Sequence, residues 1–221
     1  MERSRLGIVF DWDGVVIDSH RQHEESFEML AAELERPWEP AFFKRVFGVR
    51  NNELFPHLLH WAEAGDQERI QWLSDRKEAL YRELVVRDGI EPLAGVCAFL
   101  DELEQAGIPT SVGTSTPRKN YEVIVEVLGL RGQFHQVTAA EDVTKGKPAP
   151  DVFLKAAEKI DRLPGNCVVI EDSHAGLEAG RAAGMKTVAV ATTHPLASLQ
   201  ADLVVPDMTH VSLSAIEALF S

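Results

Sequence analysis

From about Gly89 onward, short apolar runs alternate with stretches of helical periodicity. In this region the runs typical of buried strands are Thr110–Gly113, Gln136–Ala139, Cys167–Ile170, Thr187–Ala191 and Leu203–Val205. A further run of this kind, Leu6–Phe10, lies near the start of the sequence. The helical stretches are Val96–Gln105, Tyr121–Leu128, Asp151–Ile160 and Ala175–Ala183. Strand–helix alternation of this kind indicates a parallel sheet covered by helices. We therefore expect an α/β fold, with a Rossmann-like, mostly parallel sheet and helices on both faces.

The segment between the first strand and this alternating region has no strand-like run. Its helical stretches lie near residues 21–35, 52–63 and 67–84, separated by Pro37, Pro40 and Gly65. A helical block of this length inside an α/β chain is typical of an inserted domain. The sequence therefore predicts an all-helical cap at residues 19–86, inserted into a core formed by residues 1–18 and 87–221.

Two carboxylates, Asp11 and Asp13, directly follow the first strand, and Gly14 then allows the chain to turn. A buried strand that ends in two acids places negative charge where desolvation is costly, unless a cation or a reaction requires it there. The pattern D-x-D-G alone also describes an ordinary loop after a strand. The ends of the other strands therefore decide between the two interpretations.

Polar groups follow three further strands: Thr114 and Ser115 after the second, Lys147 in the loop after the third, and Glu171 and Asp172 after the fourth. Ligands of open α/β sheets bind beyond the carboxyl ends of the strands, so these groups are expected to converge with the two acids of the first strand. Four carboxylates in one place would repel one another without a cation. Their oxygens suit a hard divalent ion such as Mg²⁺, which keeps positions for waters and phosphate oxygens.

Each of these residues alone has a simpler structural explanation. Thr116 before Pro117 is a good helix start, with the threonine as N-cap and the proline in the first helical position. Thr114 and Ser115 could only satisfy backbone groups, and a loop lysine such as Lys147 is usually solvated. The functional interpretation depends on the joint pattern.

Composition excludes several classes of protein. The 221 residues carry a net charge of −13, with a pI near 5.0, which argues against nucleic acid or an anionic membrane as partner. No apolar run approaches the ~20 residues of a membrane span. Cys97 and Cys167 are expected to be buried free thiols. These features, with no recognisable leader, predict a cytoplasmic protein, either a monomer or a weak homodimer.

The chain resembles the haloacid dehalogenase superfamily, in particular the phosphatases and phosphomutases with a helical cap inserted after the first strand. The residues that match the four motifs of that family in order and spacing are Asp11-Trp12-Asp13-Gly14, Thr114, Lys147 and Glu171-Asp172. The resemblance covers essentially the whole chain and is strongest in the core. The sequences around Lys147 and Asp172 are close to those of the sugar-phosphate members.

The resemblance implies a role for each motif residue. Asp11 is the nucleophile and Asp13 the general acid–base, which fits the ability of one carboxylate to attack phosphorus while a second moves the proton. Mg²⁺ is expected on the Asp11 carboxylate, the Asp13 backbone carbonyl and Asp172, with Glu171 close by.

The resemblance also implies that the remaining motif residues contact the phosphoryl group. Thr114 donates its hydroxyl to that group, Lys147 neutralises charge on it, and Ser115 is a further substrate-binding candidate. An acid at position 13 favours phosphate esters over haloacids, because dehalogenases of the superfamily lack it. Trp12, where the family usually has Leu or Met, is interpreted as a packing residue.

In the cap, His23, Arg50 and Lys77 fall at or near positions where relatives of β-phosphoglucomutase contact the sugar phosphate. They are candidate substrate-binding residues and favour a small phosphorylated metabolite as partner. The structural alternative is an ordinary solvated helix face.

The leading hypothesis is a Mg²⁺-dependent phosphatase acting on a small sugar phosphate or similar metabolite through an aspartyl phosphate. The alternative is a phosphohexomutase of the β-phosphoglucomutase type, in which the same group passes to a sugar hydroxyl. A non-catalytic binding module would lack one of the motif residues. Neither a dinucleotide-binding glycine motif nor the glycine pair of a serine-hydrolase elbow is present.

Overall fold

The computed structural model describes residues 5–39, 42–43 and 51–221. The described chain divides into two compact units, one of which is Ser19–Gly89 and the other the rest of the chain. The second boundary falls after Gly89 rather than after Val86, because the last helix of the inserted unit continues to Asp88. Each unit is described by itself below.

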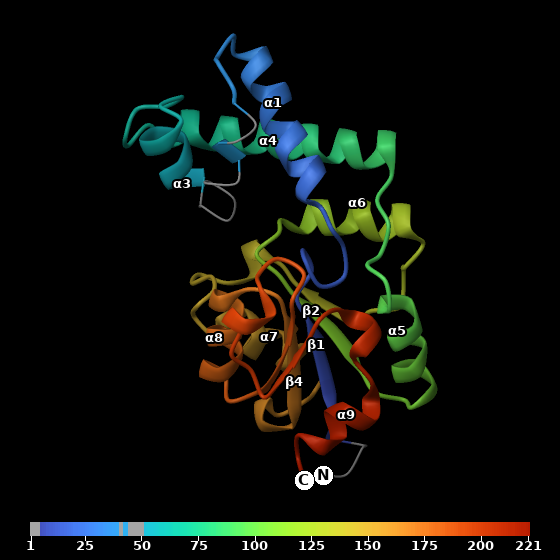
Figure 1. Ribbon diagram of the computed structural model, residues 1–221. Coiled ribbons are helices and arrows are strands. Elements are labelled where there is room, and N and C mark those ends of the chain that lie inside the picture. Colours follow the sequence, from blue (N-terminus) through green and yellow to red (C-terminus); the bar gives the residue numbers. More distant parts are fainter. Residues whose placement is uncertain (1–4, 40–41, 44–50) are drawn as a thin grey trace. The chain divides into compact units, whose positions relative to one another are not determined.

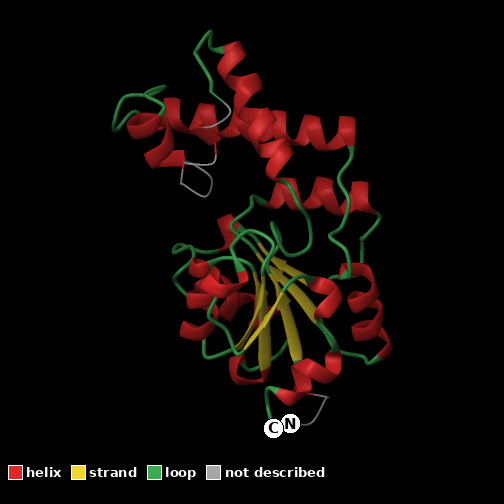
Figure 2. Ribbon diagram, in the orientation of Figure 1, coloured by secondary structure: helices red, strands yellow, loops and turns green. Residues whose placement is uncertain are grey.

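The non-inserted unit, called the core unit here, is built on a parallel sheet of six described strands (Figures 1 and 2). They are β1 (Gly7–Phe10), β2 (Thr110–Gly113), β3 (Gln136–Thr138), β4 (Cys167–Glu171), β5 (Lys186–Val190) and β6 (Leu203–Val205). Their spatial order is β3-β2-β1-β4-β5-β6, which is the order of a doubly wound sheet. The predicted Rossmann-like α/β fold is therefore confirmed.

The helices of the core unit cover both faces of this sheet (Figure 1). They are α5 (Val96–Gln105), α6 (Arg118–Leu128), α7 (Asp151–Lys159), α8 (His174–Ala182) and α9 (Leu213–Ala218), with short 3₁₀ turns η3 (Ala140–Asp142), η4 (Pro164–Asn166), η5 (Leu196–Ser198) and η6 (Met208–His210). Successive strand residues point to opposite faces. Val9 accordingly packs with α7 and α8, whereas the Phe10 ring lies 6.1 Å from that of Phe99 on α5.

Strand β1 lies in the middle of the sheet, between β2 and β4. Its four residues are fully buried, which explains why its sequence is a continuous apolar run without alternating polar residues. The ladder continues one residue further, because the Asp11 amide donates to the Ile170 carbonyl at 2.9 Å. The order of strands reverses between β1 and β4, which is the place where ligands bind in folds of this kind.

The inserted unit, called the cap here, contains helices and loops and no strand among its described residues (Figure 2). Its elements are α1 (His20–Glu33), α3 (Asn51–Glu53), the π-helical turn η2 (Leu54–Leu58) and α4 (Gln67–Asp88). The prediction of one continuous helix near 52–63 was wrong, because the chain forms only the short α3 and the π-helical turn η2 there. Pro56 cannot donate a backbone hydrogen bond, and the chain instead makes a wide turn in which Leu59 donates to Leu54.

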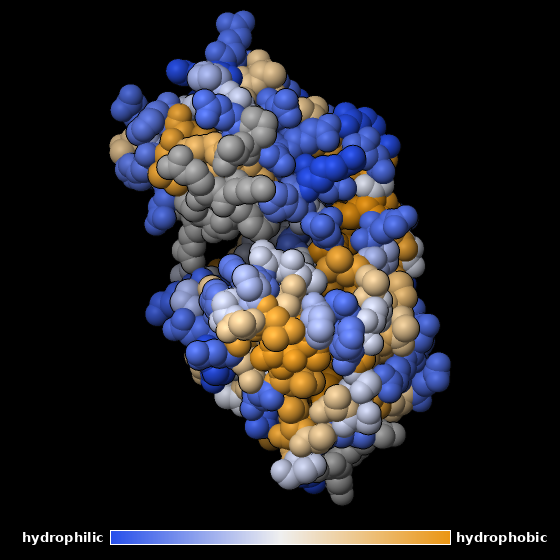
Figure 3. All heavy atoms as spheres, in the orientation of Figure 1, coloured by the Kyte–Doolittle hydropathy of each residue, from blue (hydrophilic) through white to orange (hydrophobic). Residues whose placement is uncertain are grey.

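A small apolar core holds the cap together. It includes Phe27 and Leu30 of α1, Phe55 of η2 and Leu73 of α4. Hydrophilic residues cover much of the visible cap surface in Figure 3. Surface ion pairs such as Arg87–Glu25, at 2.7 Å, add little to stability. Among the described residues, no helix combines the length and apolarity required to cross a bilayer.

The two cysteines differ in their surroundings. Cys167 is buried at the start of β4, as predicted, and burial raises the pKa of its thiol to about 12. The prediction that Cys97 is buried was wrong. Helix α5 buries Val96, Phe99, Leu100 and Leu103, which share one face, and Cys97 falls outside that face.

The sheet arrangement predicts a large effect at Phe10, whose fully buried ring contacts Phe99 and Phe134. Phe10→Ala should lower the free energy of unfolding by about 3–5 kcal/mol, because it leaves a cavity in close-packed surroundings. The control is Val127→Ala, at a residue that is 39% exposed, which should change it by less than about 0.5 kcal/mol. Denaturant unfolding followed by circular dichroism measures both, and equal effects would contradict the assigned packing.

Candidate active site

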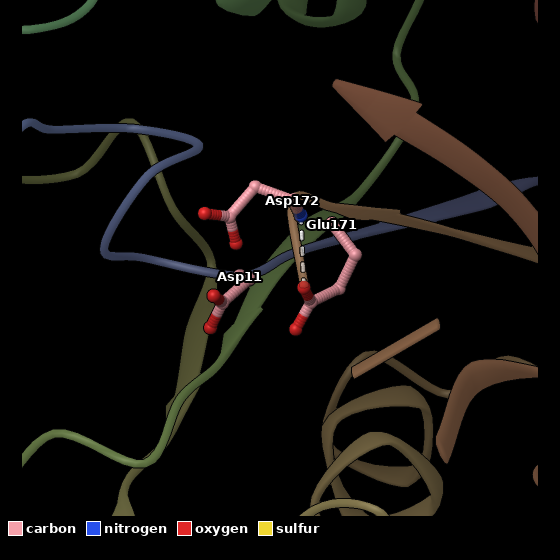
Figure 4. A group of neighbouring side chains, drawn as sticks. All are labelled: Asp11, Glu171 and Asp172. Carbon is pink, nitrogen blue, oxygen red and sulfur yellow. Dashed lines mark hydrogen bonds between the residues drawn. The ribbon is translucent and has the colours of Figure 1, made fainter. Parts of the chain in front are cut away.

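Three buried carboxylates meet where β1 and β4 end (Figure 4). Asp11 follows the last residue of β1, Glu171 is the last residue of β4, and Asp172 comes next. One oxygen atom of each lies within 4.8 Å of the others. The parallel pairing of the two strands brings these distant positions together, as expected from the sequence.

Lys147 joins two of these carboxylates. Its Nζ donates to Asp11 Oδ1 at 2.6 Å and to Glu171 Oε1 at 2.7 Å. Nζ also lies 4.8 Å from the centre of the Phe153 ring. Phe153 belongs to the first turn of α7, so this turn covers the ammonium group. The side chain of Lys147 is only 8% exposed, so it is an interior charge rather than a solvated loop lysine.

The second oxygen of Glu171 is held by the start of α8. Oε2 accepts hydrogen bonds from the Asp172 amide at 2.8 Å, the Ser173 amide at 2.8 Å and the Ser173 hydroxyl at 2.9 Å. The Ser173 hydroxyl also accepts from the Gly176 amide and so caps α8. Serine is a favoured N-cap residue type, so the capping role of Ser173 was predictable from its residue type alone. The contact of Ser173 with Glu171 could not be predicted from the sequence, except that Ser173 directly follows the Glu171-Asp172 motif.

Burial and charge shift the pKa values of this cluster in different directions. Burial raises the pKa of Asp11 well above its usual range, and this outweighs the lowering by Lys147. Burial followed by the Glu171 carboxylate raises the pKa of Asp172 to about 7. Burial opposes ionisation of Glu171 and Lys147 too. The Lys147 ammonium outweighs burial at Glu171 and lowers the pKa of that carboxyl, whereas the Asp11 and Glu171 carboxylates outweigh burial at Lys147 and raise its pKa.

The donor set of the cluster fits a divalent cation. Three carboxylates face one lysine, and the raised pKa values of Asp11 and Asp172 indicate that one ammonium group does not balance the charge. All the candidate ligand atoms are carboxylate oxygens, which suit Mg²⁺ rather than soft metals. Glu171 Oε1, although bound to Lys147, keeps a lone pair for a further contact.

Asp13 is connected to the end of β2 through a threonine. The hydroxyl of Thr116 donates to Asp13 Oδ2, and the Thr116 amide donates to the hydroxyl of Thr114 at 3.0 Å. Thr114 and Thr116 are both buried, whereas Ser115 between them is exposed. The structure therefore links Asp13 to Thr114 and turns Ser115 toward solvent.

The loop after β5 contributes two threonines that no sequence motif identified. The Thr193 hydroxyl donates to Asp172 Oδ2, and the Thr192 hydroxyl donates to the Gly14 carbonyl. Gly14 has φ +85°, and a Cβ there would lie 2.0 Å from Asp172 Oδ2. Only glycine fits between the first motif and Asp172.

Trp12 packs away from the two acids, as predicted. It is fully buried, with its ring 4.8 Å from that of Tyr121 and 5.7 Å from that of Phe134.

Two of the three predicted cap residues contact each other inside the cap. Lys77 Nζ lies 2.6 Å from His23 Nδ1 and donates to Glu78 at 3.0 Å. The His23 ring stacks on Tyr81 at 4.1 Å, and burial, followed by Lys77, holds the pKa of His23 well below its usual value. His23 Nδ1 is therefore an acceptor for the lysine. Lys77 is 4% exposed, so it does not lie on a solvated face, and Arg50 lies outside the described residues.

Comparison with known proteins identifies the family of this chain. The family model for haloacid dehalogenase-like hydrolases matches residues 6–184. The chain is 34% identical over 212 residues to the chloroplastic 5-amino-6-(5-phospho-D-ribitylamino)uracil phosphatase of Arabidopsis thaliana, an alignment that covers 94% of this chain and 56% of that protein. It is 30% identical over 210 residues to the beta-phosphoglucomutase of Bacillus subtilis, covering 93% and 91%.

The chain belongs to the haloacid dehalogenase-like hydrolase family, and the expectation of a phosphatase-type enzyme is confirmed at this level. The crystal structure of a family IA, variant 3 hydrolase from Entamoeba histolytica superposes with a TM-score of 0.87. The superposition covers 97% of this chain and 98% of the Entamoeba chain at 24% sequence identity, and it supports the fold. The chain spans little more than half of the Arabidopsis relative but nearly the full length of the Bacillus one.

The close approach of α8 to Glu171 predicts the effect of a methyl group at Gly176. A Cβ there would lie 1.6 Å from Glu171 Oε1. Alanine normally favours a helix by up to ~1 kcal/mol over glycine, but this overlap should dominate and lower the free energy of unfolding by about 1–3 kcal/mol.

Gly165→Ala is the matched control, because no atom lies within 4 Å of a Cβ built there. It should change the free energy of unfolding by less than about 0.5 kcal/mol. Thermal or denaturant unfolding compares the two variants. A Gly176→Ala protein as stable as the control would contradict the described packing of Glu171.

Proposed function

We propose that this protein is a Mg²⁺-dependent phosphomonoester hydrolase that acts on a small sugar phosphate or similar metabolite through an aspartyl-phosphate intermediate. The observation that carries the proposal is the contact of Lys147 with Asp11 in the buried carboxylate cluster. An ammonium group at 2.6 Å favours the ionised form of Asp11, but burial outweighs it and raises the pKa of this carboxyl, so a divalent cation would supply the remaining positive charge. Only the ionised carboxylate is a nucleophile.

In the first half of the reaction, a carboxylate oxygen of Asp11 attacks phosphorus, and the bond from phosphorus to the ester oxygen breaks. Asp13 gives its proton to the departing oxygen, so an alcohol leaves rather than an alkoxide. In the second half, Asp13 takes a proton from water, and the water oxygen attacks the phosphorus of the aspartyl phosphate. As this bond forms, the bond between phosphorus and the Asp11 oxygen breaks, inorganic phosphate is released, Asp11 is again a carboxylate and Asp13 is again protonated.

Charge stabilisation accounts for most of the remaining catalysis. Phosphoryl transfer depends chiefly on positioning and on balancing the charge of the oxygens around phosphorus. We assign Lys147 and the hydroxyl of Thr114 to those oxygens, and Asp11, Asp172, Glu171 and the Asp13 carbonyl to the metal. Mg²⁺, when bound, supplies a Lewis acid that offsets the negative charge of both the phosphoryl group and the carboxylates.

The substrate class is proposed from the cap and from the relatives. Lys77 and neutral His23 offer a charged donor and a ring nitrogen within one unit, and Arg50 and Ser115 remain candidate substrate contacts. The Arabidopsis and Bacillus relatives are named for a phosphate ester of a ribityl compound and for a phosphoglucose. A small phosphorylated polyol or sugar is the substrate class common to both names.

The second candidate function is a phosphohexomutase of the β-phosphoglucomutase type. It is favoured by the match to the Bacillus protein over 91% of that protein's length. The two functions share the aspartyl phosphate and differ in whether water or a sugar hydroxyl accepts the phosphoryl group. Cytoplasmic location and a monomeric or weakly dimeric state stay predictions, as does the absence of a nucleic-acid or membrane partner.

The test of the proposed function is phosphate release from a panel of sugar phosphates and other small phosphomonoesters. Wild-type protein with Mg²⁺ should release phosphate, and excess EDTA should abolish release. Asp11→Asn should reduce turnover by about 10³-fold or more, because the amide is not a nucleophile. Asp101→Asn, an exposed change on α5, is the control and should keep wild-type turnover.

Retention of more than a few per cent of activity by Asp11→Asn would refute the role of Asp11. Conversion of β-glucose 1-phosphate to glucose 6-phosphate, in the presence of a trace of bisphosphate and without free phosphate, would favour the mutase instead.

The contact from Thr193 to Asp172 predicts an effect on metal affinity. Thr193→Val keeps the shape of the side chain but removes the hydroxyl that orients the Asp172 carboxylate. Mg²⁺ affinity, measured by isothermal titration calorimetry, should fall by about 10- to 100-fold.

Thr209→Val, at an exposed threonine whose hydroxyl donates to Asp207, is the matched control and should leave Mg²⁺ affinity unchanged. Equal affinities of wild type and Thr193→Val would remove Thr193 from the metal site.

A further inference from the structure

Thr116 is held firmly in the segment between β2 and α6. Its amide donates to the Thr114 hydroxyl at 3.0 Å, and its carbonyl accepts from the Ala140 amide at 3.2 Å. The residue is 8% exposed. With both backbone groups bonded and a β-branched side chain of few rotamers, the position of the Thr116 hydroxyl is well defined.

This hydroxyl does not cap the following helix, so the structural alternative for Thr116, an N-cap role, does not hold. Helix α6 begins at Arg118, and its N-cap position is taken by Pro117, which has no side-chain acceptor. The first amide of the helix is satisfied instead by Glu141, whose Oε2 accepts from Arg118 at 3.1 Å. The threonine hydroxyl is therefore available for another partner, and it donates to Asp13 Oδ2.

We propose that Thr116 is a positioning residue for the leaving-group step: its hydroxyl fixes the Asp13 carboxyl and keeps the acidic proton on Oδ1. This inference rests on the proposed phosphatase function. In a neutral carboxyl, the carbonyl oxygen is the better hydrogen-bond acceptor. Because Oδ2 of Asp13 accepts from Thr116, the proton occupies Oδ1. That proton then has one defined position from which it can be delivered.

The proton balance of the step follows from this arrangement. As the bond between phosphorus and the ester oxygen breaks, the Oδ1 proton of Asp13 moves to that oxygen. Asp13 is left as a carboxylate, which still accepts from Thr116 through Oδ2. A charge-assisted hydrogen bond is stronger than a neutral one, so Thr116 stabilises Asp13 more after proton transfer than before. The contact thus favours the direction of the step.

The alternative is that the Thr116 hydroxyl only supports the loop or binds the phosphoryl group directly. The two roles differ in their dependence on the leaving group. A nitrophenolate departs without a proton, whereas an alkyl alkoxide requires one. Loss of a group that acts through Asp13 therefore harms alkyl esters selectively, but loss of a structural or phosphate-binding group harms both kinds of ester.

The experiment compares kcat/KM for benzyl phosphate and p-nitrophenyl phosphate, which are both aromatic and similar in size. This ratio reports on steps up to the first irreversible one, so it excludes hydrolysis of the aspartyl phosphate. Thr116→Val should lower kcat/KM for benzyl phosphate by about 10-fold or more. General acid catalysis typically accelerates a reaction by about 10²–10⁴-fold, and the variant should lose part of that acceleration. For p-nitrophenyl phosphate the loss should stay within about threefold, and Thr116→Ser should restore both.

A double-mutant cycle with Asp13→Ala tests whether Thr116 acts through Asp13. In the Asp13→Ala background, Thr116→Val should change kcat/KM for benzyl phosphate by less than about threefold, because the two residues form one unit. Thermal melting checks the fold of every variant. If Thr116→Val fails to fold, the same comparison is made with Thr116→Ala.

Three results overturn the positioning role: equal losses for both esters, no loss for either, or a full additional loss in the Asp13→Ala background. Failure of wild-type protein to hydrolyse any ester would instead overturn the proposed function. The two failures are therefore distinguishable.

Discussion

The buried ammonium group of Lys147, bonded to Asp11 and to Glu171, is the interaction on which the rest of this site depends. A carboxylate in the interior is stable only if its charge is balanced and its lone pairs are used. Lys147 supplies positive charge to the end of β1 and the end of β4 at once. The Asp172 and Ser173 amides and the Ser173 hydroxyl occupy the other oxygen of Glu171. Removing Lys147 would leave three acids facing one another. The arrangement therefore requires the lysine and fits a cation beside it.

Threonine hydroxyls hold the outer members of the cluster in place. Thr116 reaches Asp13 from the end of β2, and Thr193 reaches Asp172 from the end of β5. Each carboxylate accordingly has a fixed orientation set by a neutral donor from a neighbouring strand end. A neutral donor orients a carboxylate without neutralising it, so the charge remains available for a metal or for a proton. This division, with one lysine for charge and several hydroxyls for orientation, suits chemistry in which the carboxyl groups have different tasks.

Much of the core was predictable, and the reasons are local. The fully buried run Gly7–Phe10 predicted a central strand, and the repeated alternation after Gly89 predicted a doubly wound sheet. The less accurate predictions concern features that sequence patterns describe poorly. Pro56 converts an expected helix into a π-helical turn, and Cys97 lies just off the buried face of α5. Thr116 resembles an N-cap in sequence, yet Glu141, which is distant in the chain, satisfies the helix amide and leaves the hydroxyl for Asp13.

The sequence by itself determined the fold class, the inserted helical unit and the motif residues at the strand ends, because periodicity and residue type are properties of the local chain. Only the tertiary structure decided which donor serves which carboxylate. Thr193 and Glu141 act on residues far away in the chain, and Gly14 and Gly176 are required by side chains that approach from other elements. Parallel pairing of β1 with β4 brings these groups together. Burial makes the contacts among Asp11, Lys147 and Glu171 obligatory, since an unpaired polar group in the interior has no water to replace its partner.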